Sequence, residues 1–144
     1  MPRGYPDYFG QSIFPKYGTI TIDDQVVNCP QGVVTTIHNI EGKGRIYGGA
    51  FATGAGTPDT TDELQIIIDG ITLFNITMYD FWDIFSPVED HLPMRFLYYD
   101  TGSPKFRLAY IKDFTYEKSF VIKYKSKAVG GVFIISRYIY ANIV

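Results

Sequence analysis

The amino-acid sequence predicts an all-β fold, an antiparallel β-sandwich of about eight strands with one short helical insertion. Ile and Val greatly outnumber Leu and Ala, and Thr is abundant, a bias that favours strands over helices. Gly and Pro interrupt the chain at short intervals, which is typical of sandwiches and barrels. A jelly roll is favoured, because its two packed sheets manage their exposed edges. An immunoglobulin-like sandwich is the alternative, but its pair of cysteines is absent.

Alternating polarity and turn residues place the expected strands. Their ranges are 18–29, 33–40, 45–53, 64–69, 71–78, 94–99, 106–111, 119–125 and 132–140. The first two ranges are expected to pair as a hairpin across a Pro-Gln-Gly turn. Asp69-Gly70 predicts a two-residue type I′ turn, and its hairpin is expected near the centre of a sheet. Gly48 and Gly49 are expected to mark a β-bulge.

Residues 1–17 form a separate N-terminal arm in front of a sandwich domain that covers residues 18–144. The arm contains three prolines, which forbid a regular helix and disfavour a central strand. It also contains five aromatic residues, which an ordinary disordered tail lacks. We therefore expect an extended segment that lies on a surface. This surface belongs to its own domain, to a neighbouring copy or to a larger assembly.

Residues 79–92 break the strand pattern. Tyr79, Trp82 and Phe85 recur at intervals of three, which predicts a short helix or helical turn that ends before Pro87. The rings lie beside acidic residues, so this segment could stack a sugar ring and bind its hydroxyl groups. The candidate ligand-binding residues are Tyr79, Phe81, Trp82 and Asp83. The alternative is that the rings close one end of the sandwich core.

Catalytic and metal-binding patterns are missing, so the sequence predicts a protein that is not an enzyme and has no cofactor. There is no GxSxG nucleophile motif, Cys29 has no local partner for catalysis, and His38 and His91 are the only histidines. His38 is expected to be structural or at the surface. The single Cys29 excludes an internal disulfide and is expected to be a small buried residue. Two groups of acidic residues, at 59–63 and 80–91, lack the spacing of a known metal site, so no metal is expected.

Charge and hydropathy exclude two further classes of partner. The net charge of −2 and the pI of about 5.6 provide no basic field for nucleic acid. Lys118, Lys123, Lys125 and Lys127 are expected on the solvent face of a strand. No apolar run is long enough to span a membrane, and no signal peptide is recognisable. We expect synthesis in a reducing cytosol.

Two parts of the sequence resemble small structural proteins of phage virions. Gly4-Tyr5-Pro6-Asp7-Tyr8-Phe9-Gly10, followed by Phe14-Pro15-Lys16-Tyr17-Gly18, is similar to the opening of many phage minor structural proteins. The body, with its Gly-rich turn and the segment LQIIIDG, resembles jelly-roll head-decoration (cement) proteins.

This resemblance implies a non-enzymatic protein on the outside of a capsid or tail, often trimeric, made in the host cytoplasm and located in the virion. Its expected partners are the major capsid protein or another virion protein, and further copies of itself. The arm residues that would lie along a partner are Tyr5, Pro6, Tyr8, Phe9, Phe14 and Tyr17. The alternative function is a carbohydrate-binding or receptor-binding module that uses residues 79–91.

Overall fold

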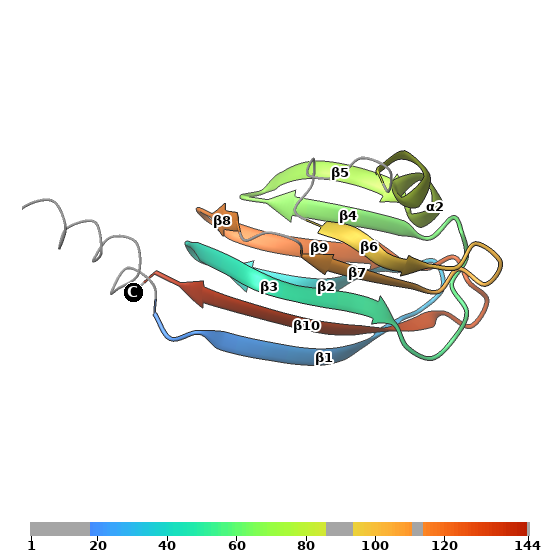
Figure 1. The fold of residues 1–144 in the computed structure, drawn as a ribbon, viewed down its shortest axis with the longest axis horizontal. Coiled ribbons are helices and arrows are strands. Elements are labelled where there is room, and N and C mark those ends of the chain that lie inside the picture. The colour runs from blue at the N-terminus through green and yellow to red at the C-terminus, as the bar shows by residue number, and fades with distance from the viewer. Residues whose placement is uncertain (1–17, 86–93, 111–113, 144) are drawn as a thin grey trace, which may run out of the picture.

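The computed structural model describes residues 18–85, 94–110 and 114–143 (Figure 1). These residues form ten strands and one short helical segment. The strands are β1 (Thr21–Cys29), β2 (Val34–Glu41), β3 (Gly44–Thr53), β4 (Glu63–Ile68), β5 (Ile71–Thr77), β6 (Met94–Tyr99), β7 (Phe106–Tyr110), β8 (Phe114–Tyr116), β9 (Ser119–Lys125) and β10 (Val132–Asn142). The helical segment consists of α2 (Met78–Asp80) and a π-helical turn, η1 (Phe81–Phe85). The prediction of an all-β sandwich with one short helical insertion is therefore confirmed.

The strands form two antiparallel sheets with jelly-roll connectivity. One sheet has the order β1-β10-β3-β7-β6, with β8 also paired to β3, and the other has the order β2-β9-β4-β5. From the two ends of the described chain inward, β1 pairs with β10, β2 with β9, β3 with β7 and β8, and β4 with β5. Successive pairs fall in alternate sheets, so the chain is one long antiparallel ribbon rolled into a sandwich.

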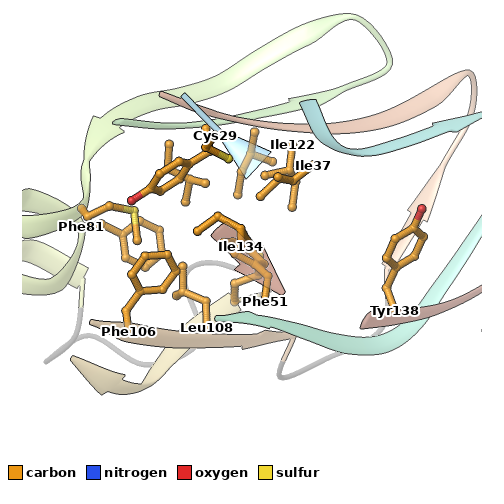
Figure 2. Close-up of a cluster of buried hydrophobic side chains, with 14 of the residues drawn as sticks. Cys29, Ile37, Phe51, Phe81, Phe106, Leu108, Ile122, Ile134 and Tyr138 are labelled. Atoms are coloured by element: carbon orange, nitrogen blue, oxygen red, sulfur yellow. The ribbon is translucent and has the colours of Figure 1, made fainter. Parts of the chain in front are cut away.

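Alternation along the strands supplies the core between the sheets. In β9, Phe120, Ile122 and Tyr124 are buried, while the residues between them are half-exposed, as the sequence predicts. Figure 2 shows Ile37 and Ile122 of one sheet facing Phe51 and Ile134 of the other. Cys29 is fully buried in the same cluster, and burial raises the pKa of its thiol to about 11.

The turn between β4 and β5 confirms the predicted type I′ geometry. Asp69 and Gly70 have φ values of 55° and 79°, and such positive values favour Asp and Gly. The Asp69 carboxylate also accepts hydrogen bonds from three backbone N–H groups between β8 and β9. The distances are 2.8 Å to Glu117, 2.6 Å to Lys118 and 3.2 Å to Ser119. These bonds, that of Lys118 foremost, lower the pKa of Asp69 and join the hairpin to the chain that crosses between the sheets.

Two predictions about strand pairing are wrong. The ranges 18–29 and 33–40 do not form a hairpin, because β1 and β2 belong to different sheets. The β4–β5 hairpin lies at a sheet edge, not at the centre, because β5 has only β4 as a neighbour. The estimate of about eight strands also missed β8, whose three residues are too few to show alternation. In each case local polarity identifies strands but carries no information about their distant partners.

The predicted bulge lies in β3, next to Gly48. Ile139 of β10 pairs with Gly48 while Tyr140 pairs with Ile46, so Tyr47 is the extra residue. Gly49 follows with a φ of 150°, and a Cβ atom there would lie 2.5 Å from the carbonyl oxygen of Arg137. The close approach of β10 to β3 therefore requires glycine at position 49.

Candidate functional site

The arm residues proposed as a partner-binding segment, Tyr5, Pro6, Tyr8, Phe9, Phe14 and Tyr17, lie outside the described residues. The structure does show where the described chain begins. The backbone N–H of Gly18 donates to the carbonyl oxygen of Asn142 at 2.7 Å, beside the start of β1 and the end of β10. Gly18 therefore lies at one end of the six-stranded sheet.

The aromatic residues of the helical insertion separate into two groups. Phe81 is buried in the core, where its ring meets Phe96 edge-on at 5.2 Å. Trp82 stacks on Tyr99 with ring centroids 5.5 Å apart and an interplanar angle of 18°, while Tyr79 lies 5.9 Å from Trp82. Tyr79 and Asp83 are exposed. The rings of Tyr79 and Trp82 come together as expected, but Phe81 does not join them, and a sugar site there stays a prediction.

A buried carboxylate lies behind this aromatic group. Asp62 is 0% exposed, and it accepts hydrogen bonds from the Tyr124 hydroxyl at 2.6 Å and from the Lys127 N–H at 2.7 Å. Burial raises the pKa of Asp62, and burial together with this carboxylate raises that of Tyr99 to about 12. The Tyr99 hydroxyl is buried and has no hydrogen-bond partner in the described part of the chain. Sequence analysis placed Asp62 in an acidic loop and missed its burial.

His38 and Ser136 form a second buried polar pair that the sequence did not indicate. The His38 Nε2 and Ser136 Oγ atoms are hydrogen-bonded, and the imidazole lies 4.0 Å from the Tyr138 ring. A serine beside a histidine is the geometry of a nucleophile and its base. Both side chains are buried, however, and burial lowers the pKa of His38 to about 3, so this imidazole is a poor base. The pair is structural.

The buried imidazole predicts that acid destabilises the fold. The pKa of His38 is about 3 in the folded protein, against 6.5 when solvated, so below pH 6.5 the unfolded chain binds a proton that the folded protein does not. The free energy of unfolding should then decrease by up to about 1.4 kcal/mol per pH unit as the pH falls. Asp23, which accepts a hydrogen bond from the Tyr138 hydroxyl at 2.8 Å, is the carboxylate that partly offsets this effect.

Urea unfolding of wild type and His38→Gln between about pH 7 and pH 5 measures this contribution. Gln keeps a nitrogen near Ser136 and does not titrate, so its stability curve should be flatter in this range. Parallel curves for the two proteins would show that His38 does not carry the effect.

The described residues, 18–85, 94–110 and 114–143, show neither a cluster of metal ligands nor a long apolar helix. Within these ranges no three His, Cys, Asp or Glu side chains are grouped so that they could hold a metal ion. None of the helical segments in the same ranges has the length and hydropathy needed to cross a membrane.

The outer face of the four-stranded sheet carries polar side chains around β9, together with the exposed Val34 of β2. Lys123 and Lys125 of β9 point outward, opposite the buried residues of the same strand, which confirms the predicted solvent face for these two. Lys118 and Lys127 are exposed but lie outside β9. Lys125 lies 4.0 Å from Glu63. A shallow depression on this face is lined by Val34, Glu63, Gln65, Asn75, Lys123 and Lys125. A face of this kind is suited to water.

The outer face of the six-stranded sheet is apolar along β1 and β10. Val26 pairs with Ile135, and Ile22 pairs with Ile139. The most exposed apolar side chains here are Val26 (67%), Ile22 (56%), Ile135 (47%) and Phe133 (41%). We call these four residues the apolar stripe. The ion pair of Asp24 and Arg137 lies between Ile22 and the other three residues of the stripe. Exposed clusters of large apolar residues are typical of interaction surfaces.

The stripe continues into a hollow on the same face. The outward positions of β3 after its bulge are Gly48, Ala50 and Ala52, which alternate with inward residues such as Phe51, and Gly54 follows the strand. Ile135 and Arg137 of β10 lie on one side of these small residues, and Arg107 of β7 lies on the other. The hollow has a volume of about 260 Å³ and is lined by Ala50, Phe51, Ala52, Arg107, Ile135 and Arg137. We call it the β3 groove.

Sequence reasoning missed both the apolar stripe and the β3 groove. Apolar residues occupy both faces of β1, so alternation alone does not mark its outer face. The alternation of Gly and Ala at positions 48 to 54 was a usable signal, because small residues at every second position of a strand leave one face hollow.

Comparison with protein-family models and curated proteins identifies no relative of this chain. No protein-family model matches the chain, and no curated protein is significantly similar to it. The structure therefore defines the class of the protein, a jelly-roll β-sandwich, and its function is inferred from its own residues.

Proposed function

We propose that the protein is a non-enzymatic structural subunit of a phage virion, which decorates or cements the capsid or tail. It associates with further copies, in a trimer by our proposal, and with the major capsid protein or another virion protein. The observation that carries this proposal is the apolar stripe on an outer sheet face, where a monomer would have polar residues.

The outer face of the six-stranded sheet supports an assembly role. Both sheets bury their inner faces in one core, so the core does not explain the exposed apolar residues along β1 and β10. Burial of such a stripe between subunits stabilises the assembled state. The resemblance of residues 4–18 and of the segment LQIIIDG to virion proteins is the reason for proposing a phage virion as the assembly.

Strand β1 lies at one edge of the six-stranded sheet, next to the apolar stripe. It pairs with β10 over nine consecutive residues without an irregularity, and it contains no Lys or Pro. Such residues are the usual protection of an edge strand against pairing with other chains. The charged residues of β1 are Asp23 and Asp24. An edge without Lys or Pro, beside exposed apolar side chains, is consistent with a surface that is covered in the assembled protein.

A carbohydrate-binding or receptor-binding module is the alternative, and it has less support. The rings expected to hold a sugar serve the packing of the domain instead, since Phe81 is buried and one face of Trp82 is covered by Tyr99. Only Tyr79 and Asp83 of the four candidate residues are exposed.

The experiment is a charge substitution in the apolar stripe, followed by light scattering after size exclusion. Val26→Lys should weaken self-association about tenfold or more, because the interface would then have to bury an unpaired ammonium group. Val34→Lys is the matched control, since Val34 is a similarly exposed valine on the other sheet and should have no effect. A wild-type protein that is monomeric and does not bind virions, or equal effects of both variants, would contradict the proposal.

A further inference from the structure

The β3 groove has the shape of a track for an extended chain. Its floor has no side chain larger than a methyl group at positions 50 and 52, because alanine alternates there with the inward-facing Phe51. Its walls are the side chains of Ile135, Arg137 and Arg107 on the two neighbouring strands. The floor therefore follows the direction of β3.

The volume and the lining of the β3 groove argue against a small-molecule ligand. Its volume of about 260 Å³ lies below the range of roughly 300–1,000 Å³ that is common for ligand pockets. The polar side chains that line it are Arg107 and Arg137, and Arg137 already pairs with Asp24 at 3.1 Å. A floor of small residues between two guanidinium groups suits large aromatic side chains, which fill the space and attract a cation to the faces of their rings.

The N-terminal arm of the chain is rich in large aromatic side chains, whereas the floor of the β3 groove has only small ones. Its seventeen residues include five aromatic side chains, which suit the floor of small residues, and two basic and one acidic residue, of which Asp7 can pair with a groove arginine. We infer that the β3 groove of one copy binds residues 1–17 of a neighbouring copy. This inference rests on the proposed function and names the partner segment for the outer face of the six-stranded sheet.

The position of Gly18 favours a neighbouring copy over the arm's own domain. At Gly18 the chain is still hydrogen-bonded to Asn142, in line with β1, at the end of the six-stranded sheet. Reaching the groove of the same domain would require the chain to reverse its direction immediately before this point. Seventeen extended residues span at most roughly 56 Å, which is ample to reach an adjacent subunit.

The test uses a full-length chain whose own arm is silenced by Tyr8→Ser, Phe9→Ser and Phe14→Ser. A fluorescent peptide of residues 1–17 is titrated with this protein, and anisotropy reports binding. We expect saturable binding that is lost when the same three substitutions are made in the peptide. Adding Ala52→Gln, which fills the groove, or Arg107→Gln, which removes a cation from its wall, should weaken binding about tenfold or more. Adding Val34→Gln on the other sheet is the matched control and should change nothing.

The outcomes separate this inference from the proposed function. Absence of peptide binding, or binding that Ala52→Gln and Arg107→Gln leave unchanged, would overturn the inference. If Val26→Lys still disrupts self-association in that case, the proposed function stands with a different occupant on this face. Peptide binding together with a wild-type protein that is monomeric at all concentrations would show that the arm folds onto its own domain, which also overturns the inference.

Discussion

Replacing Asp62 with leucine is expected to lower the free energy of unfolding by about 3–5 kcal/mol. The substitution leaves the buried Tyr124 hydroxyl and the Lys127 N–H without their acceptor, and each buried donor without a partner costs roughly 1–3 kcal/mol. For a domain of this size the melting temperature should fall by about 10 °C or more. Thermal unfolding followed by circular dichroism measures the effect.

Asp62→Asn is the matched control for this prediction. The amide keeps one oxygen for the Lys127 N–H, and its nitrogen can donate to the Tyr124 oxygen. Burial already raises the pKa of Asp62, so the site disfavours the charged form and should accept a neutral side chain of the same shape. We expect a loss of about 1 kcal/mol or less. Equal losses for Leu and Asn would show that the hydrogen bonds do not hold this part of the fold.

Replacing Phe51 with alanine is the second large effect. Phe51 is buried, and its ring packs edge-on against Phe106 at 6.2 Å and against His38 at 6.0 Å. Removing a buried aromatic side chain costs about 3–5 kcal/mol, because it loses apolar burial and leaves a cavity. Denaturant unfolding should show a lower midpoint.

Phe133→Ala is the control, since this phenylalanine lies on the outer face of β10 in the apolar stripe. Its substitution should change the stability of the monomer by about 0.5 kcal/mol or less. It should instead weaken self-association under the proposed function. A large loss of monomer stability for Phe133→Ala, or a small one for Phe51→Ala, would contradict the assignment of the two faces of the six-stranded sheet.

Local signals in the sequence were sufficient for the elements of the fold. The alternation in β9 and the Asp69-Gly70 turn depend on residues that are neighbours in the chain, and both are confirmed. The pairing of β1 with β10 depends on residues from opposite ends of the described chain. Periodicity shows which side chains share a face but not which strand lies beside them, so the false hairpin of β1 and β2 could not be excluded.

The candidate site was harder to predict for a related reason. Asp62 is charged and lies in a loop, and its burial depends on the Tyr124 hydroxyl of a strand far along the chain. The β3 groove likewise exists because β10 and β7 place larger side chains on both sides of small ones. A site built from three strands is visible only when the order of the strands is known.

The rolled ribbon has a consequence for the synthesis of the protein. Strand β1 is made before the other strands that the structure describes, and β10, the strand that pairs with it there, is made after them. Until then β1 carries unpaired backbone groups on both edges, together with apolar side chains on its outer face. Sheets that depend on such distant pairings fold slowly and expose strands that can aggregate. A nascent chain that stalls before β10 is complete should therefore be a substrate for chaperones.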